Sequence, residues 1–339
     1  YKNGNVTKLS PYISRGVLST RFIYEKLVEN GINLKKCEKF IQELAWRDFW
    51  QQIWVSKGSL INKDLKRPQE DVNDLKISKS LVEAKTGINS VDEEISNLYE
   101  NGYMHNHMRM YVASIATNIA KSHWKIPAKW MYYHLLDGDW ASNALSWQWV
   151  AGSNSNKKYY ANQDNINKYF NSNQKNTFLD NSYEFISSMN IPNEVEEKYD
   201  LELNSNLQNN KEIRIDNSLP TLIYNYYNID PNWRKDEKVN RVLIFEPRVF
   251  AEYPVSQKCV DFSLNLSKNI KDIQIFYGNF EEFCSRYNVP NMIFKEHPLN
   301  KHYSGLEDQR DWLFKIEGEY LSFFKSVSYT HLTLPTKQM

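Results

Sequence analysis

Apolar residues recur at spacings of three and four through most of the first half of this chain, and this pattern restricts that half to helices. Four stretches show it: "GVLSTRFIYEKLVEN", "CEKFIQELAWRDFWQQIW", "NHMRMYVASIATNIAKSHW" and "PAKWMYYHLL". Such spacings place side chains on one face of a helix, whereas a strand would need an alternation that is rare here. The pattern predicts a helical domain over residues 1–172.

A different pattern follows a polar stretch rich in Asn, Glu and Ser, which we expect to be a linker over residues 173–218. Short β-branched and aromatic runs then alternate with helix-like segments; the runs are "RVLIFEP", "IQIFYG" and "MIFKEH". This alternation predicts a small parallel α/β domain over residues 219–325. No glycine-rich phosphate loop follows the first of these strands. The expected fold class is mainly α, a helical domain followed by a small α/β unit.

The two ends of the chain differ from the rest. It starts at Tyr1 rather than Met, so we expect a piece of a longer protein. The last stretch, "SVSYTHLTLPTKQM" at residues 326–339, departs from the charged and aromatic sequence before it and resembles translated sequencing-adaptor read-through. We expect this tail to be non-native and leave it out of the fold prediction.

Composition narrows the class of protein. The chain has 339 residues, of which 41% are hydrophobic, enough for a real core. It has neither a long apolar run nor an apolar leader, so we expect a cytoplasmic, monomeric protein with no membrane partner. The three cysteines Cys37, Cys259 and Cys284 are odd in number and far apart, which favours reduced core residues over disulfides.

Charge is unevenly distributed along the chain. Residues 1–180 hold 24 Lys and Arg against 18 Asp and Glu, and residues 181–339 hold 18 against 23. A moderately basic first half is compatible with a polyanionic partner, although solvated charged faces are the commoner cause.

Three segments of the helical half place polar residues where an ordinary helix would be apolar. If "FIQELAWRDFW" is helical, Phe40, Glu43, Trp46, Arg47 and Trp50 fall along one stripe. One helix face would then mix a carboxylate, a guanidinium and large rings. The plainer interpretation is an i,i+4 pair of Glu43 with Arg47 beside a core stripe.

In "YMHNHMRMYVAS", Asn106, Arg109 and Met110 line one side of the expected helix. His105 and His107 raise the alternatives of a metal site or a His-Asn-His nuclease. Residues at i,i+2 diverge on a helix, and no nearby cysteine or acid completes a ligand set. We therefore expect no metal.

The third segment, "DGDWASNALSWQWVAG", brings Asp137, Asp139 and Asn143 close to several tryptophans. Buried carboxylates need a cationic or donor partner, and Arg109 and Arg47 are the candidates. A pocket with paired Arg and Asp, amides and stacking rings suits a large planar ligand with phosphates. A flavin dinucleotide has this character.

Four motifs, "KLSPYISRGVLSTR", "ELAWRDFW", "GYMHNHMRMYVAS" and "DGDWASNALSWQWVAG", resemble the FAD-binding domain of the photolyase/cryptochrome family in order and approximate spacing. The resemblance covers residues 5–172. It implies an all-helical domain that holds FAD folded into a U shape, with the adenine against the flavin. The residues that would hold the cofactor are Thr7, Lys8, Leu9 and Ser10 at the pyrophosphate, Phe40 and Arg47 in the cavity wall, Asn106, Arg109, Asp137 and Asp139 at the adenine and flavin edges, and Asn143 opposite the flavin N5.

The resemblance also implies an activity, the light-driven repair of pyrimidine dimers in DNA by electron transfer from reduced FAD to a flipped-out lesion. Glu43, Trp46, Met110 and Trp149 would contact the dimer. Met110 stands where a histidine would favour the (6-4) photoproduct, so the cyclobutane dimer is the expected lesion.

Two further tryptophans would act on the cofactor, with Trp147 as the flavin-proximal member of an electron relay and Trp124 as the next. Lys157 and Lys158 are candidates for phosphate contacts, and a solvated loop is the alternative for both.

The chain departs from the family pattern in two respects. It contains no tryptophan between Val55 and His123, so the usual third relay member is missing, and Tyr99, Tyr103 or Tyr111 is a possible substitute. This piece of sequence does not include the family's usual N-terminal antenna domain, and the antenna pigment stays unknown. Two other functions remain open: a cryptochrome-like light receptor without repair, and a structural helical protein without cofactor.

Overall fold

The computed structural model describes residues 4, 6–208, 212–313 and 323. Contacts divide the chain into two compact units, and each is described by itself. The helical unit comprises Tyr1–Lys8, Ser59–Asn206 and Phe250–Phe262; the mixed unit comprises Leu9–Gly58, Leu207–Val249 and Ser263–Met339. A helical part and an α/β part are therefore both present. The grouping does not follow the boundaries expected from the sequence, because residues 9–58 group with the sheet.

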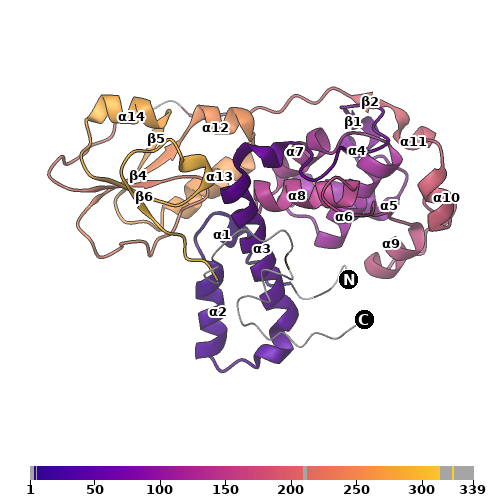
Figure 1. Ribbon diagram of the computed structural model, residues 1–339, viewed down its shortest axis with the longest axis horizontal. Helices are drawn as coiled ribbons and strands as arrows, with labels where there is room; N and C mark the ends of the chain where they lie inside the picture. The colour runs from indigo at the N-terminus through magenta and orange to yellow at the C-terminus, as the bar shows by residue number, and fades with distance from the viewer. Residues whose placement is uncertain (1–3, 5, 209–211, 314–322, 324–339) are drawn as a thin grey trace. The chain divides into compact units, whose positions relative to one another are not determined.

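The helical unit contains η2 and α4 to α11, and a short ribbon of two strands (Figure 1). A π-helical segment, η3, directly follows α6. The bounds are η2 Gly58–Asn62, α4 Lys79–Val82, α5 Asn89–Asn101, α6 Asn106–Ser114, η3 Ile115–Ile119, α7 Lys125–His134, α8 Trp140–Ala151, α9 Gln163–Phe170, α10 Tyr183–Ser188 and α11 Asn193–Glu196, with β1 Ile77–Ser78 antiparallel to β2 Lys198–Tyr199.

Local chemistry explains where the central helix α8 begins and ends. Asp139 caps its N-terminus by accepting a 2.7 Å hydrogen bond from Ser142 N. Gly152 ends it with φ +86°, a left-handed conformation that glycine adopts without strain. In α7, Pro127 lies in the first turn, where its missing N–H costs no helical hydrogen bond. The four helical segments expected from the sequence are thus present in the structure.

The segment expected to be a linker, residues 173–218, is partly built into the helical unit. It contains α10, α11 and β2, and the side chains of Leu179, Ile186 and Val195 are buried. Apolar residues at wide intervals anchor a sequence that is otherwise polar. This wide spacing gives no helical or strand periodicity, which is why the composition alone indicated a linker.

The mixed unit begins with a helical hairpin in which α2 and α3 lie side by side (Figure 1). The hairpin and a five-stranded parallel sheet with further helices make up the described elements of this unit. Their bounds are α1 Ser10–Ser14, α2 Thr20–Glu29, η1 Leu34–Cys37, α3 Glu38–Lys57, β3 Thr221–Tyr224, β4 Asn240–Phe245, α12 Pro247–Glu252, α13 Gln257–Ser267, β5 Ile273–Tyr277, α14 Phe280–Tyr287, β6 Met292–Lys295, η4 Pro298–Asn300 and β7 Leu306–Asp308; α12 and α13 each run across a unit boundary.

The sheet has the order β5-β4-β3-β6-β7, and every neighbouring pair is parallel. In chain order this is third, second, first, fourth, fifth, the order of a doubly wound α/β fold. The three strands expected from the sequence are β4, β5 and β6, and their parallel pairing is confirmed. The sequence analysis missed β3, which has four residues, and β7, which has three and is partly exposed at the sheet edge.

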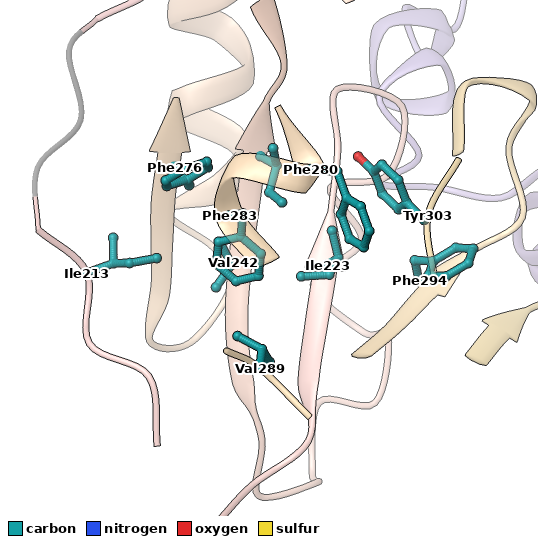
Figure 2. Packing of buried hydrophobic residues seen from close by; sticks show 10 residues of the cluster. Ile213, Ile223, Val242, Phe276, Phe280, Phe283, Val289, Phe294 and Tyr303 are labelled. Atoms are coloured by element: carbon teal, nitrogen blue, oxygen red, sulfur yellow. The ribbon is translucent and has the colours of Figure 1, made fainter. Parts of the chain in front are cut away.

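Side chains from neighbouring strands meet α14 in one apolar core (Figure 2). Ile223 lies in register with Val242 on one side and Phe294 on the other. Phe280 and Phe283 of α14 pack on this row, and the ring of Phe280 stacks on Tyr303 at 4.2 Å. Rows of apolar residues in register hold a parallel sheet against a helix.

In the helical hairpin, Asp48 is a buried carboxylate. Its oxygens accept hydrogen bonds from Thr20 Oγ1 at 2.9 and 3.0 Å and from Leu313 N at 2.7 Å. Burial raises the pKa of Asp48 to about 6, although these bonds and the Arg310 and Arg47 charges oppose the shift.

This raised pKa predicts a pH dependence of stability with a definite sign. Between the unfolded pKa of 3.8 and the folded value of about 6, the folded chain binds a proton that the unfolded chain has released. Stability from Asp48 is therefore full below pH 3.8 and is lost as the pH rises through 6, by about 3 kcal/mol. Asp48→Asn removes this loss. Urea unfolding at pH 4 and pH 7 measures it.

The matched control is Asp216→Asn, an exposed aspartate whose pKa is lowered by hydrogen bonds from Ser218. Relative to wild type, Asp216→Asn should not gain free energy of unfolding between pH 4 and pH 7. If the wild type and Asp48→Asn lose stability in parallel over this range, Asp48 does not have the raised pKa.

Candidate functional site

An ion pair in the helical unit joins Arg109 of α6 to Asp137, which precedes α8. Arg109 Nη2 lies 3.0 and 2.9 Å from the two carboxylate oxygens, and Nε donates to Met104 O at 2.8 Å. Only 5% of Asp137 is exposed. The pairing expected from the sequence is therefore present. A guanidinium fixed at both Nε and Nη2 presents its remaining edge in one orientation.

Asp139 and Asn143 occupy the first turn of α8. Asp139 is buried as the helix cap, and Asn143 N donates to its carbonyl at 2.9 Å. The Asn143 side chain is buried, and its Nδ2 donates to Ala128 O of α7 at 2.8 Å. That bond holds the amide in one orientation. A fixed amide can both donate to and accept from a ligand edge.

The residues at the start of α6 differ in exposure. Asn106 is exposed and Met110 is half-buried. His105 caps the helix, because its Nδ1 accepts from His107 N at 3.3 Å, and burial lowers the pKa of both imidazoles. Over residues 4, 6–208, 212–313 and 323, no three His, Cys, Asp or Glu side chains are placed to hold a metal ion.

The tryptophans of the helical unit occupy contrasting environments. Trp124 and Trp147 are buried, whereas 41% of Trp149 is exposed and its ring centroid lies 5.8 Å from Tyr159. Trp140 is fully buried and donates to Asn62 Oδ1 at 2.7 Å, which makes it a core residue.

The expected residues of α3 lie in the mixed unit. Phe40 and Trp46 join an apolar cluster that also includes Leu9 and Leu313. The ring of Phe323 stacks on Trp46 at 3.8 Å with planes 11° apart, so in this structure that ring face is covered.

Two charged side chains share this helix. Arg47 donates from Nη1 to Ser14 Oγ at 2.9 Å. Glu43 is exposed, yet partial desolvation by the surrounding chain raises its pKa, and the Arg47 charge opposes the shift.

The expected pyrophosphate stretch begins with exposed residues. Thr7 and Lys8 are exposed, and Lys8 has φ +54°. Leu9 and Ser10 are half-buried at the start of α1. A positive φ at a lysine redirects the chain just before the helix.

The lysines after α8 differ from each other. Lys158 is committed to Asp71 Oδ2 at 2.6 Å and to Glu70 O, whereas Lys157 is exposed. Of the two, Lys157 is the better candidate for a phosphate contact.

The expected site residues thus fall into two sets. In the helical unit the structure brings Arg109 to Asp137 and places Asp139 beside Asn143. In the mixed unit it brings Leu9, Phe40 and Trp46 into one cluster. The members of the helical unit are Thr7, Lys8, Asn106, Arg109, Met110, Trp124, Asp137, Asp139, Asn143, Trp147 and Trp149; those of the mixed unit are Leu9, Ser10, Phe40, Glu43, Trp46 and Arg47.

The sequence analysis missed the environment of Trp124. Its Nε1 donates to Asp64 Oδ1 at 2.7 Å, and His123 Nε2 lies 3.4 Å from the same oxygen. Asp64 stands in the run "NKDLKRP", where a lone acid among cations gives no sign of a partner sixty residues later.

In the mixed unit, Glu246 directly follows β4, and its carboxylate is occupied by hydrogen bonds within the protein. Glu246 accepts hydrogen bonds from Phe280 N, His302, Tyr303 Oη and Arg248 at 2.8 to 3.1 Å. Burial opposes ionisation, but these partners, His302 foremost, lower its pKa overall. An acid at this place can hold a nucleotide ribose in doubly wound folds, and here it closes the fold instead.

The donor set of the helical unit fits a flavin cofactor. A doubly anchored guanidinium, a buried carboxylate and a fixed amide offer the hydrogen bonds that adenine and isoalloxazine edges require. Arg109, Asp137, Asp139 and Asn143 would hold these edges. Across the described residues, no helix has the length and apolar character that crossing a membrane demands.

Comparison with known proteins agrees with this fit. Residues 40–228 match the model of the FAD binding domain of DNA photolyase. The deoxyribodipyrimidine photo-lyase of Alkalihalophilus pseudofirmus is 31% identical over 148 residues, 43% of this chain and 31% of the relative. Cryptochrome DASH of Danio rerio is 30% identical over 187 residues, 53% of this chain and 34% of the relative.

A solved structure, the cryptochrome of Synechocystis sp. PCC6803, matches 48% of this chain and 36% of its own with 25% identity and a TM-score of 0.43. The family model covers more than half of the residues, so the chain belongs to the photolyase/cryptochrome family. FAD is the cofactor of the matched domain. The chain spans about a third of the length of the curated relatives that it matches.

The buried ion pair predicts a cofactor phenotype. Asp137→Ala leaves the partly buried Arg109 guanidinium without its carboxylate, a change that costs roughly 1–3 kcal/mol. We expect flavin retention to fall several-fold. The absorbance ratio of flavin to protein after purification measures it.

Glu83→Ala is the matched control, since it breaks an ion pair of the same unit in which Lys85 is highly exposed. It should retain flavin as the wild type does. A fully flavinated Asp137→Ala protein would refute the assignment of the pair to the cofactor site.

Proposed function

We propose that this chain is the cofactor-binding part of an enzyme that uses light to split cyclobutane pyrimidine dimers in DNA. The observation that carries the proposal is Trp149. Among the described tryptophans it is the most exposed, at 41%, on a helix whose other rings, Trp140 and Trp147, are buried. An exposed indole costs solvation free energy unless it has a ligand to stack on.

The position of this ring supports a nucleic-acid ligand. The loop of residues 153–158 follows the helix that carries Trp149. Within this loop, Ser155 Oγ donates to Trp149 O at 2.8 Å. The loop carries Lys157, which is exposed. An aromatic platform beside a cation suits an unstacked base and its phosphate, and it selects damage by shape because a flat ring does not read base order.

The residues of α3 support the same substrate. Glu43 is an exposed carboxyl on α3, and a carboxyl can form a hydrogen bond with a thymine edge. By the family resemblance, Trp46 and Met110 are further candidates for contact with the dimer.

Reduced FAD, when bound and excited, supplies one electron to the dimer and takes it back after the ring has opened. The chain's own residues bind and orient. Arg109 and Asp137 would hold one cofactor edge, and Asn143 would lie opposite the flavin N5 with an amide that suits either protonation state. Trp147 and Trp124 would restore the reduced cofactor under light.

A light receptor without repair is the second candidate. The match to cryptochrome DASH covers 53% of this chain, which lies within the 43% to 55% covered by matches to photo-lyases, so coverage does not separate the two functions. A receptor would need the same FAD residues but no lesion wall, so loss of repair on changing Glu43 or Trp149 separates the two functions.

Glu43→Ala should keep FAD and lose repair about ten-fold, since the hydrogen bond to the lesion is worth roughly 1.5 kcal/mol. Loss of dimers from irradiated oligothymidylate under blue light, with chemically reduced protein, measures repair. Glu38→Ala, at the start of the same helix, is the control and should repair normally. Unchanged repair in Glu43→Ala would remove its assigned role.

Trp149→Ala should weaken binding of dimer-containing DNA by about 5-fold to about 150-fold, because stacking on one aromatic ring contributes about 1–3 kcal/mol. Fluorescence anisotropy with damaged and undamaged oligonucleotides measures the affinity. Tyr183→Ala removes another exposed ring of the same unit and should leave the affinity unchanged. Equal affinities of wild type and Trp149→Ala would contradict the proposal.

A further inference from the structure

The indole of Trp124 is bonded to a carboxylate, unlike the two other buried indoles of the helical unit whose acceptors the structure gives. Trp124 Nε1 donates to Asp64 Oδ1 at 2.7 Å. Trp130 donates to the Tyr99 hydroxyl and Trp140 to the Asn62 amide oxygen. Three indoles of similar burial thus face three different acceptors.

The acceptor decides what happens when an indole loses an electron. An indole radical cation is a far stronger acid than indole, so its N–H proton moves to any adjacent base. A carboxylate is such a base, whereas a phenol hydroxyl and an amide oxygen are not. Trp124 is therefore placed to lose an electron and a proton together.

The surroundings of Asp64 suit this transfer. Trp124 is fully buried, while the side chain of Asp64 is 20% exposed and that of His123 is 22% exposed. A proton that reaches Asp64 is thus at the edge of the solvent. Its other oxygen, Oδ2, accepts from Gln69 N at 2.9 Å.

His123 is a donor here and not a competing base. Its Nδ1 accepts from Lys125 N at 3.3 Å, which leaves Nε2 protonated and facing Asp64. Burial lowers the pKa of this imidazole, against the influence of Asp64. The neutral ring helps to hold the carboxylate toward the indole.

Hydrogen bonds of two glutamines hold Trp124 and the loop of Asp64 in place. Gln69 Nε2 donates to Ser122 O at 3.0 Å, and Trp124 N donates to Gln69 Oε1 at 2.9 Å. Gln148 binds the same loop at Leu65 N. Asp64 is therefore fixed at hydrogen-bond distance before any charge moves.

A hydrogen bond from an indole to a carboxylate is not sufficient for this proton transfer if another group neutralises the carboxylate. The mixed unit contains such a case. Trp233 also donates to a carboxylate, Asp308, at 2.9 Å. Asp308 is neutralised by Arg234, which binds both of its oxygens. The bond partners of Asp64 are an indole, a backbone N–H and a neutral imidazole.

We propose that Asp64 is the proton acceptor for Trp124 in light-driven reduction of the cofactor, and that this transfer ends the electron relay at Trp124. Trp124 gives one electron, by way of Trp147, to the photo-oxidant, an excited oxidised flavin. Its Nε1–H bond breaks and an O–H bond forms on Asp64, which leaves a neutral indolyl radical and a carboxylic acid. An external thiol later returns one electron and one proton to Trp124 and becomes a thiyl radical, and Asp64 releases its proton to the solvent.

This explains how the relay can work with no tryptophan between Val55 and His123. Loss of the proton lowers the tendency of the electron to return, which is the effect that a further relay member would otherwise provide. The inference rests on the proposed function for the role of Trp124 as an electron donor.

The first test needs no cofactor. In the nitrogen–proton spectrum of the flavin-free protein, the Trp124 indole signal should lie downfield and move upfield in Asp64→Asn. The Trp140 signal, whose acceptor is Asn62, should stay in place. An unmoved Trp124 signal would overturn the hydrogen bond on which the proposal stands.

The second test is flash photolysis of the flavin-loaded protein. The wild type should form the neutral tryptophan radical, more slowly in heavy water. Asp64→Asn should keep the radical cation, which recombines, so the yield of stable photoreduction falls at least several-fold. Asp200→Asn breaks an exposed ion pair of the same unit, with Lys76, and should form the neutral radical as the wild type does.

Two results would overturn the inference: equal neutral-radical kinetics in wild type and Asp64→Asn, or wild-type photoreduction in Trp124→Phe. If Asp64→Asn does not fold, a persistent radical cation without an isotope effect in the wild type overturns it equally. Dimer repair by chemically reduced wild-type protein is scored separately, because it bypasses the relay; its absence would refute the proposed repair function and not the role of Asp64.

Discussion

The arrangement of the helical unit depends on one buried amide. Gln148 is fully buried in α8, and both ends of its side chain are committed: Oε1 accepts from Leu65 N at 3.0 Å and Nε2 donates to Ile61 O at 2.8 Å. A buried amide must satisfy both ends, so the loop after η2 has one acceptable position against α8. Asp64 lies within that loop.

The same rule orders the other polar groups around α8. Asp139 is used as a cap, Asn143 binds Ala128 of α7, and Asp137 holds Arg109 of α6. Each polar side chain in this apolar surrounding therefore fixes a neighbouring segment. The residues proposed to contact the flavin are held by the hydrogen bonds that make their burial tolerable.

Local signals in the sequence could predict much of this. The 3 and 4 spacing predicted α2, α3, α6 and α7, and β-branched runs predicted β4, β5 and β6. The pairing of Arg109 with Asp137 followed from the need of a buried acid for a cation. The strands β3 and β7 were missed because they are too short for a period to appear.

Other long-range pairings could not be predicted. Asp64 and Trp124 are sixty residues apart, and neither run has a spacing that points to the other. The grouping of residues 9–58 with the sheet depends on apolar contacts such as those of Leu313, whose partners no local pattern identifies. Such contacts are decided by packing, for which a single sequence carries no periodic signal.

The bond between Asp48 and Leu313 N has a consequence for how the chain is made. The two residues are 265 positions apart, so the carboxylate in the helical hairpin leaves the ribosome long before its backbone donor exists. Contacts of such high sequence separation close late. The hairpin must therefore wait, with one acceptor solvated and its apolar face incompletely covered, until Leu313 has been synthesised.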